Sequence, residues 1–470
     1  MARKKYFCLH AHFYQPARGN PITGEIGPEP LAAPFRNWNE RITDECYRPN
    51  AELGNLNVIS FNFGETLLAW MEQHHPDVYE MILDADRRNV AEHGVGNALA
   101  MPMHHTILPL ARRRDKRTQV AWGKAAFEAR FGRAPEGIWL PEMAVDLETL
   151  GLLYEQGFKF TIVSGGQVAS RYDAERDGAG PFWVALPGDA RIAVFVRHEK
   201  LSTDLAFGIE HLGGAGHWAR HVLIPHRKKA GPLTMAAVDG ETFGHHHQGE
   251  HHFLRWLMTH EASGAGYEIT SLARYLQAHP PTRDIRLKER TAWSCFHGLA
   301  RWATGCACTE GYSGWKGALR RALDRLACEI DHTYAGHVGA LGVDPWALRD
   351  GYIGVVLRRE RGADYLARMG LHLDAAAQQR VLDMLAAQYH AQVMYSSCAF
   401  FFEDFARPEP SYAIANAACA ADLMQRATGM DLTGGFRADL AVVVSGKNGA
   451  NGMQAYDEVV AERALSPEAG

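Results

Sequence analysis

Short apolar runs alternate with longer amphipathic stretches over roughly the first 285 residues of the chain. Several of these runs are apolar at every position, which is typical of parallel strands that are covered on both faces. The runs that we expect to form strands are 6–9, 58–61, 137–140, 160–163, 192–196 and 233–238. The stretches that we expect to form helices between them include 65–72, 117–131 and 147–156. Strand and helix in repetition predict a parallel α/β sheet or barrel.

The pattern changes after the prolines at 280–281. Apolar residues recur at helical spacing from Trp315 to Ile330, with arginines between them, which predicts one long amphipathic helix. The apolar run 440–444 is a candidate for a late strand. Further helices are expected over 347–367, 374–396 and 411–427. The expected domains are a barrel domain over 1–285, a mainly helical domain over 286–460 and a flexible tail over 461–470.

The composition is that of a folded protein without a bulk affinity for polyanions. The chain has 470 residues, 47% of them apolar, which allows a sizeable core in one large domain with an appendage or in two or three domains. A net charge of -5 argues against a nucleic-acid binder, and the short basic run 111–117 is expected to be a solvated helix face. The first apolar stretch ends at His10, too soon for a signal peptide, and no uncharged run is long enough to span a membrane. We therefore expect a soluble cytoplasmic protein with no nucleic-acid or membrane partner, and the oligomeric state stays open.

The eight cysteines are spread through a long chain, so they do not form the framework of a small disulfide-rich protein. Cys8 lies within the first apolar run and is expected to be a buried free thiol. Cys306-Ala307-Cys308 together with Cys295 offers ligands for a metal ion, but no second Cys-x-x-Cys pair accompanies them. Structural thiols are therefore the favoured interpretation.

The segment 244–252 is rich in histidine. His247 and His251 are four residues apart, which on a helix would place both on one face. Together with His10 and His12 they would supply enough ligands for a zinc or manganese ion. Clustered loop histidines more often form hydrogen bonds, so we assign no metal and no cofactor to the chain.

Residues with chemical capacity follow several of the predicted strands. Glu142 and Asp239 each come just after an apolar run, His10 and His12 end the first run, and Asn62 ends the second. A carboxylate in apolar surroundings is costly unless it is hydrogen-bonded, paired or put to use. Because parallel α/β barrels bind ligands at the carboxyl ends of their strands, we expect these groups to converge on one face. Two carboxylates facing each other suit glycoside hydrolysis, in which one is ionised and the other protonated.

These residues resemble the five short motifs of glycoside hydrolase family 57, which occur here in order. The motifs are matched by His10, His12, Gln15 and Pro16 with Phe13-Tyr14 inserted; by 61–67, with Glu65 in the place of a proline; by Trp139, Pro141 and Glu142; by Asp239, Glu241, Phe243, Gly244 and His246; and by Glu289 and Trp293. The phrases that look like one subgroup of that family, whose reaction is poorly defined, are 38–43, 114–119 and 293–298. The resemblance spans roughly residues 5–430.

The resemblance implies an incomplete (β/α)7 barrel, followed by a mainly α-helical C-terminal domain that contributes to the active-site cleft. It implies action on α-glucans as an amylase, a glucanotransferase or a branching enzyme, with retention of configuration through a glycosyl-enzyme intermediate. Glu142 is then expected to be the nucleophile and Asp239 the general acid/base. The residues expected to bind the saccharide are His10, His12, Trp139, Glu241, His246 and Trp293.

Three alternatives stay open at this point. His10 and His12 could instead be a hydrogen-bonded pair that fixes the loop, and Glu241 could orient a histidine rather than contact a sugar. The chain could be a metal-dependent carbohydrate hydrolase on a similar barrel, such as a deacetylase or a zinc mannosidase. It could also be a carbohydrate-binding protein that has lost turnover.

Overall fold

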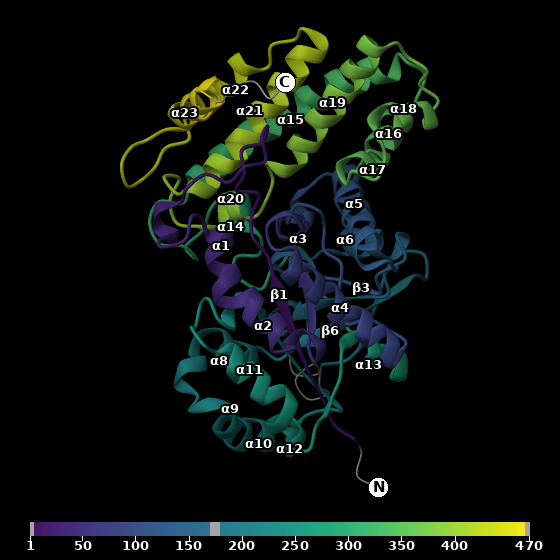
Figure 1. The fold of residues 1–470 in the computed structure, drawn as a ribbon, viewed down its shortest axis with the longest axis vertical. Coiled ribbons are helices and arrows are strands. Elements are labelled where there is room, and N and C mark those ends of the chain that lie inside the picture. The colour runs from purple at the N-terminus through teal and green to yellow at the C-terminus, as the bar shows by residue number, and fades with distance from the viewer. Residues whose placement is uncertain (1–3, 170–178, 466–470) are drawn as a thin grey trace. The chain divides into compact units, whose positions relative to one another are not determined.

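The computed structural model describes residues 4–169 and 179–465 (Figure 1). The chain forms two compact units. The first unit contains residues up to Gln15, Pro28–Pro102 and Phe127–Trp293, and the second contains Pro16–Gly27, Met103–Ala126 and the residues from Ser294 onward. In the part of the chain that the structure describes, no helix is both long and apolar enough to cross a membrane.

Parallel strands form the core of the first unit. These strands are β1 (Tyr6–Phe13), β2 (Ser60–Phe63), β3 (Gly137–Ile138), β4 (Phe160–Ser164), β6 (Arg191–Arg197) and β7 (Leu233–Asp239). Each of them overlaps one of the six runs that the apolar pattern predicts as strands. β1 pairs with β2 and β7, and β4 pairs with β3 and β6, in every case in parallel.

Backbone bridges connect these strands into one sequence of neighbours. Ala98 bridges to Phe61 of β2, and Ala100 bridges to Ile138 of β3. The order is therefore β7, β1, β2, 98–100, β3, β4 and β6. One hydrogen bond joins the first and last strands of this order: the backbone N–H of His198, just after β6, donates to Met235 O of β7 at 2.8 Å. The predicted α/β class with a helical C-terminal region is confirmed.

Two strands were not among the six expected runs. β5 (Phe182–Ala185) pairs antiparallel with β6, and β8 (Glu268–Ile269) pairs in parallel with β1. β8 has only two residues, one of them charged, so it gives no apolar run. β5 is apolar at all four positions, so the pattern contained this strand although it was not selected.

Side chains from several of the parallel strands form one apolar core. Cys8 of β1 packs there with residues of the other parallel strands, and as predicted its thiol is buried and free. The residues that represent the other strands in this core include Leu99, Trp139, Ile162, Phe195 and Met235. Because successive residues of a strand face opposite sides, His10 and His12 lie on the same inner face as Cys8.

Helices surround this sheet and fill the rest of the first unit. They are α1 (Trp38–Ile42), α2 (Arg48–Glu52), α3 (Glu65–His74), α4 (Pro76–His93), α6 (Leu147–Glu155), α8 (Glu199–Gly208), α9 (Gly214–Trp218), α10 (Ile224–Lys229), α11 (His251–Trp256), α12 (Ala262–Gly264) and α13 (Leu272–Ala278). α5 (Arg113–Phe131) contributes residues to both units. Three of these helices, α3, α5 and α6, are those that the sequence predicts.

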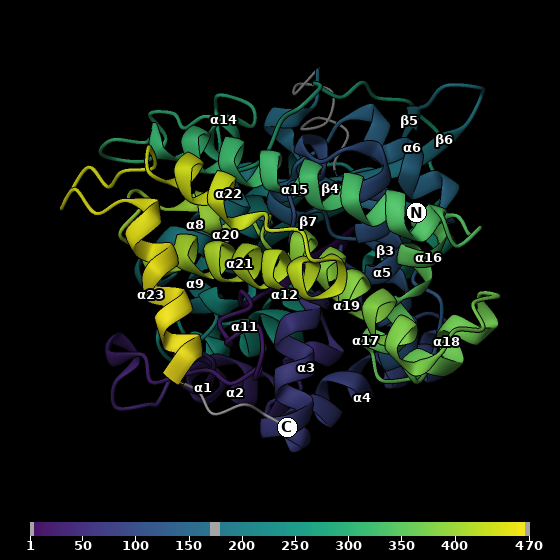
Figure 2. The same ribbon diagram turned by 90° about the horizontal axis from the view of Figure 1, so that it is seen from above.

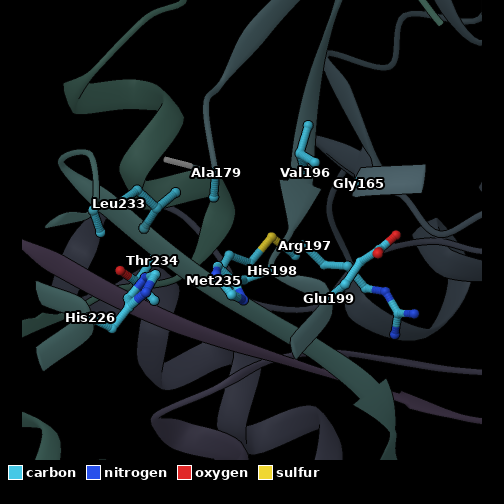
Figure 3. A pocket seen from close by; sticks show the side chains of 11 residues that line it. Gly165, Ala179, Val196, Arg197, His198, Glu199, His226, Leu233, Thr234 and Met235 are labelled. Atoms are coloured by element: carbon cyan, nitrogen blue, oxygen red, sulfur yellow. The ribbon is translucent and has the colours of Figure 1, made fainter. Parts of the chain in front are cut away.

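A small pocket lies beside β6 and β7 (Figure 3). Arg197, His198 and Glu199 line it at the end of β6, and Thr234 and Met235 line it from β7. Its volume of about 20 Å³ holds a single water molecule, so it is too small to be a saccharide site.

The second unit consists of helices. They are α14 (Ala300–Ala303), α15 (Trp315–Gly339), α16 (Pro345–Gly351), α17 (Ile353–Val356), α18 (Gly362–Arg368), α19 (Ala375–Val393), α20 (Cys398–Phe401), α21 (Pro408–Thr428), α22 (Thr433–Leu440) and α23 (Gly452–Leu465). The long helices α15, α19 and α21 pack along one another (Figures 1 and 2). The expected helices from Trp315, over 374–396 and over 411–427 are therefore confirmed.

The helical stretch expected over 347–367 is present, but turns divide it into α16, α17 and α18, and one of these turns places Arg358 at a φ of 55°. The late strand expected over 440–444 is wrong, because α22 ends at Leu440 and Val444 makes one isolated bridge with Asn451. Val442 is 68% exposed whereas Leu440 and Val443 are buried, so this apolar run is buried only in part. Of the expected tail, residues 466–470 lie outside the described part of the chain.

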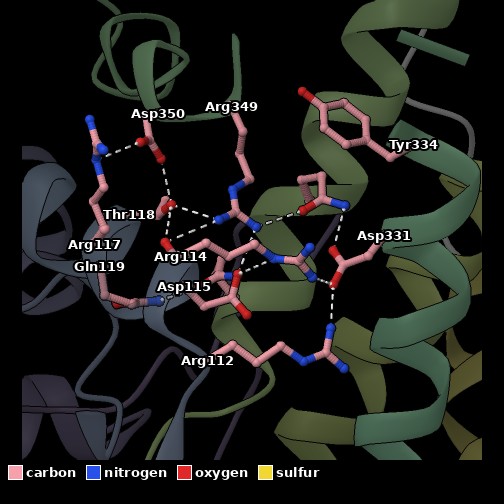
Figure 4. Close-up of polar contacts among 12 residues, drawn as sticks. Arg112, Arg114, Asp115, Arg117, Thr118, Gln119, Asp331, Tyr334, Arg349 and Asp350 are labelled. Carbon is pink, nitrogen blue, oxygen red and sulfur yellow. Dashed lines mark hydrogen bonds and ion pairs between the residues drawn. The ribbon is translucent and has the colours of Figure 1, made fainter. Parts of the chain in front are cut away.

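The basic run that was expected to be a solvated helix face is solvated only in part, at Arg112, Arg113 and Arg117. Lys116 is only 1% exposed. The run also takes part in a polar network with the helices of the second unit (Figure 4). Arg112 Nη1 donates to Asp331 Oδ2 of α15 at 2.8 Å, and the fully buried Arg349 of α16 donates to Asp115 Oδ1 at 2.8 Å. Asp331 and Arg349 are distant from the run in sequence, so the charge run alone could not reveal this network.

Candidate active site

Glu142 is held in an unusual backbone conformation just after β3. It lies in the short 3₁₀ turn Pro141–Met143 with φ 57° and ψ 20°. A positive φ at a residue with a side chain costs about 1–3 kcal/mol and persists where the surroundings enforce it. Trp293 holds Glu142 in this conformation at two points. Its backbone N–H donates to Glu142 O and its indole Nε1–H donates to Glu142 Oε2, both at 3.0 Å. Gln167 Nε2 holds the next carbonyl, Met143 O, at 2.7 Å.

Asp239 is the last residue of β7 and pairs in register with His12 of β1. Burial raises the pKa of Asp239 to about 8, and the negative charges of Glu241 and Glu142 act in the same direction. The charge of Arg197 opposes this shift. Asp239 and Glu142 are therefore close enough for their charges to interact, and the Asp239 carboxyl is protonated at neutral pH.

Arg197, at the end of β6, connects several parts of the site. Its Nη1 donates to Ala237 O at 3.0 Å and its Nε to Ser164 Oγ at 3.1 Å. Its guanidinium lies 4.6 Å from the centre of the Trp293 ring. Burial lowers its pKa to about 10, so it stays cationic at neutral pH. Arg197 was not among the expected site residues, although it directly follows the apolar run 192–196 and so stands at the end of a predicted strand.

His10 and His12 are buried, neutral and joined by Asn62 of β2. Asn62 lies 3.1 Å from His10 Nε2 and 3.0 Å from His12 Nδ1. The second nitrogen of His10, Nδ1, lies 3.1 Å from Ser60 Oγ. Burial lowers the pKa of both histidines to about 3. His10 therefore has both ring nitrogens engaged within the protein, and Asn62 connects it to His12.

Trp139 is fully buried and packs against the two histidines. Its ring stacks at 5.0 Å on His10 and at 4.7 Å on His12, and Trp293 meets it edge-on at 5.3 Å. The ring is thus packed between protein groups, and a sugar has no exposed face of Trp139 on which to stack.

Glu241 is buried and accepts hydrogen bonds from two tyrosines. Its Oε1 accepts from Tyr47 Oη–H at 2.6 Å and from the backbone N–H of Tyr14 at 3.1 Å. Burial raises the pKa of Glu241 to about 7, and these hydrogen bonds oppose the shift. The Glu241 carboxylate therefore holds the backbone of Tyr14 and so positions the inserted pair Phe13-Tyr14. His246 is exposed, and its backbone N–H donates to Glu241 O at 2.8 Å.

The histidine-rich segment does not have the geometry that a shared helix face requires. α11 begins at His251, so His247 lies before the helix. His247 Nδ1 lies 3.1 Å from Glu210 Oε1, and its Nε2 lies 3.1 Å from Ala206 O. The His247 ring is therefore directed at Ala206 and Glu210 and does not share a helix face with His251.

Glu65, which stands in the place of a proline in the second motif, is turned toward Arg130. Its two carboxylate oxygens accept from Arg130 Nη2 at 2.5 Å and from Arg130 Nε at 2.7 Å. Both side chains are nearly buried. The replacement therefore anchors the start of α3 to α5.

The comparisons with known proteins cover most of the chain. Residues 5–288 match the family described as Glycosyl hydrolase family 57, and residues 313–469 match a domain of unknown function (DUF3536). Alpha-amylase 1 of Dictyoglomus thermophilum is 25% identical over 201 residues. That match covers 43% of this chain and 27% of the relative, so the chain spans only about a quarter of the curated relative's length.

Solved structures share the fold at low sequence identity. An exo-type maltose-forming amylase from Pyrococcus sp. ST04 is 14% identical, with a TM-score of 0.71 over 97% of this chain and 88% of that one. A GH57-type branching enzyme from Pyrococcus horikoshii is 15% identical, with a TM-score of 0.57 over 93% and 94% of the two chains. A 4-alpha-glucanotransferase from Thermococcus litoralis is 15% identical, with a TM-score of 0.57 over 90% and 60%.

Proposed function

Because the chain belongs to glycoside hydrolase family 57, we propose that it cleaves or transfers α-linked glucosyl units by double displacement, with Glu142 as nucleophile and Asp239 as general acid/base. The observation that carries this proposal is that Glu142, just after β3, and Asp239, the last residue of β7, are close enough for their charges to interact. Burial, the charge of Glu241 and the charge of Glu142 raise the pKa of Asp239 to about 8. A carboxyl group that keeps its proton near neutral pH can act as proton donor beside a second carboxyl group that attacks.

The reaction proceeds in two steps. Glu142 attacks the anomeric carbon while Asp239 gives its proton to the leaving glycosidic oxygen, which forms a glycosyl ester on Glu142 and releases the first product. Asp239, now ionised, takes a proton from water or from a sugar hydroxyl, and that oxygen displaces Glu142 from the anomeric carbon. Two inversions give net retention of configuration.

The neighbouring groups have supporting roles in this proposal. Trp293 fixes Glu142 through the two hydrogen bonds at 3.0 Å, so that its carboxylate keeps one orientation. His12 lies beside Asp239 in the strand register and is neutral, which suits a hydrogen bond to a sugar hydroxyl. Trp139 stacks on both His10 and His12 and so holds the His12 ring in place, and Glu241 positions Tyr14.

The substrate class follows from the named relatives. They are amylases, a branching enzyme and a glucanotransferase, so α-linked glucans are the substrates to try first. Incubation with a series of maltooligosaccharides, with the products separated by chromatography, distinguishes the two outcomes. Shorter products alone indicate hydrolysis, whereas a redistribution of chain lengths indicates transfer.

Two variants test the assigned roles. Glu142→Gln and Asp239→Asn should each lower turnover by orders of magnitude while folding is kept, and Glu92→Gln, at an exposed position of α4, should not. NMR of the first product should show the anomeric configuration of the substrate. Inverted product, or near-normal turnover in either site variant, would overturn the mechanism.

A further inference from the structure

Four side chains of the second unit lie close together in the structure, and in the sequence their residues fall between the two segments that match known families. They are Cys295, His297, Cys306 and Cys308. Their ligand atoms, three Sγ and one histidine nitrogen, all lie within 4.8 Å of one another. Residues 295–308 fall after the first matched segment, which ends at residue 288, and before the second, which begins at residue 313. Neither match therefore accounts for this cluster.

The spacing of the ligand atoms is that of a tetrahedral site for one ion. The Cys295 Sγ atom lies 3.7 Å from Cys306 Sγ and 3.9 Å from Cys308 Sγ. His297 Nδ1 lies 3.2 Å from Cys308 Sγ. Around a tetrahedral zinc ion, with Zn–S bonds near 2.3 Å and Zn–N bonds near 2.0 Å, two sulfurs are about 3.8 Å apart and a nitrogen and a sulfur about 3.5 Å apart. The four atoms therefore already surround a space of the right size.

The local backbone brings the two ligand pairs together. Cys295 and His297 precede α14, and Cys306 and Cys308 follow it. Gly305, just before Cys306, has a φ of 89°, and a Cβ built there would lie 2.2 Å from Ser313 O. Only glycine fits this turn, which returns the chain to the first pair of ligands.

Two buried cationic side chains lie beside the cluster. Arg301 Nη2 donates to Cys308 O at 3.1 Å. Lys316 is fully buried, and its Nζ donates to Thr309 Oγ1 at 3.3 Å, one residue after Cys308. Buried cations require a compensating negative charge. A divalent ion with three thiolates and one neutral imidazole carries a net charge of −1 and would supply it.

We propose that Cys295, His297, Cys306 and Cys308 bind one zinc ion in a closed, structural site. Three thiolates and an imidazole are soft and borderline ligands that select zinc over calcium or magnesium. All four positions are taken by protein side chains, which leaves none for a substrate, so the ion stabilises the segment 294–314 that precedes α15. The three cysteines alone, without His297, favoured structural thiols. That histidine completes the set.

The first experiment measures metal in the purified full-length chain under reducing conditions. Elemental analysis should find about one zinc per chain. Replacement of zinc by Co²⁺ should produce the thiolate-to-cobalt charge-transfer absorption and the intense d–d bands of tetrahedral cobalt. Removal of the ion by a chelator should lower the melting temperature, and added zinc should restore it. These readouts do not depend on turnover, so they remain valid if the proposed function fails.

Variants assign the site. Cys306→Ser and Cys308→Ser should lose the stoichiometric zinc, and His297→Ala should weaken its retention against a chelator. Cys328→Ser is the matched control, because Cys328 is an exposed thiol in the same unit, outside the cluster, and should keep the zinc. If the ligand variants do not fold, the stoichiometry and the cobalt spectrum of the unchanged protein still decide. A metal-free protein whose melting temperature does not respond to zinc, or a Cys295–Cys306 disulfide found by peptide mapping without reductant, would overturn the proposal.

Discussion

Trp293 donates its indole N–H to Glu142 Oε2 at 3.0 Å, and its backbone N–H to Glu142 O at the same distance. The same indole ring lies over Arg197, whose charge acts on Asp239. One tryptophan thus restrains the proposed nucleophile and contacts the cation that adjusts the proposed acid. The motif around Trp293 indicated that the residue belongs to the site. The structure adds that Trp293 donates two hydrogen bonds to Glu142.

Trp293→Phe should therefore impair catalysis more than folding. Phenylalanine keeps an aromatic ring for Arg197 and Trp139 but cannot donate to Glu142. Loss of one hydrogen bond to a charged group, worth about 1.5–3 kcal/mol, should reduce kcat/KM by roughly 10- to 100-fold. Trp256→Phe is the matched control, since Trp256 Nε1 also donates to a glutamate, Glu261, but is exposed at the surface. A Trp293 variant with the activity of the control would contradict this role.

The pH dependence of kcat/KM should report the pKa of Asp239 and the effect of Glu241 on that pKa. Asp239 must be protonated to act as an acid, so activity should fall as the pH rises through about 8. Glu241→Gln removes a negative charge that raises the pKa of Asp239, and an amide oxygen can still accept from Tyr47. The alkaline limb should therefore move to lower pH, by roughly half a unit to one unit. A shift in the opposite direction would show that Glu241 acts otherwise.

Asp239→Asn should stabilise the protein at alkaline pH. The pKa of Asp239 rises from the usual 3.8 to about 8 on folding, so the folded state holds a proton that the unfolded state has lost between these values. This contribution to stability is complete below about pH 4 and is lost as the pH rises toward 8. Asparagine is neutral in both states and avoids the loss. The variant should exceed the parent by about 1 kcal/mol or more at pH 9 and should match it near pH 4, as measured by thermal unfolding. Equal stability at both pH values would mean that Asp239 is not buried as described.

The fold was largely predictable because fully covered parallel strands produce uninterrupted apolar runs. All six expected runs overlap strands, whereas β8 is too short to give such a run and the apolar run of β5 was not selected. The run 440–444 shows the converse error, since this apolar run is partly exposed and is not a strand. Hydrophobic pattern identifies segments that can be buried, but tertiary contacts decide which of them are.

The candidate site was predictable where a side chain follows a strand. This rule selected Glu142, Asp239 and His12, and in the structure Asp239 pairs in register with His12 and is influenced by the charge of Glu142. The rule could not show that Trp139 stacks on the histidines or that Tyr47, from a helical segment, bonds to Glu241, because both facts are long-range contacts. Residue type and motif selected Trp139 as a saccharide-binding residue, but its ring is fully buried among protein groups.

Glu65→Gln should reduce stability and leave the catalytic constants nearly unchanged. The carboxylate of Glu65 makes a two-point contact with the nearly buried Arg130, which also bonds to Glu72 at 3.0 Å. Glutamine is neutral, so the Arg130 guanidinium keeps less negative charge beside it, and the free energy of unfolding should fall by about 1–3 kcal/mol. Glu80→Gln, in an exposed pair with Arg87, is the control and should change stability by less than about 0.5 kcal/mol. A changed product pattern with Glu65→Gln would instead implicate the altered motif in substrate choice.

Arg349→Met tests whether the buried network of the second unit stabilises it. Arg349 is fully buried and donates to Asp115 at 2.8 Å, to Gln388 at 3.1 Å and to Thr118 at 2.7 Å. Methionine fills much of the volume but leaves the Asp115 carboxylate without this partner, which should cost about 3–5 kcal/mol in denaturant unfolding.

Two further variants separate charge and geometry from volume at Arg349. Arg349→Lys keeps the charge but not the planar fork that reaches several acceptors at once, so it should fall between the parent and Arg349→Met. Arg361→Met is the surface control: its side chain is 84% exposed and pairs with Asp364, so its loss should change stability by less than about 0.5 kcal/mol. If Arg349→Met were as stable as this control, the network would contribute specificity of packing rather than free energy, because a well-packed apolar residue can replace a buried ion pair without loss.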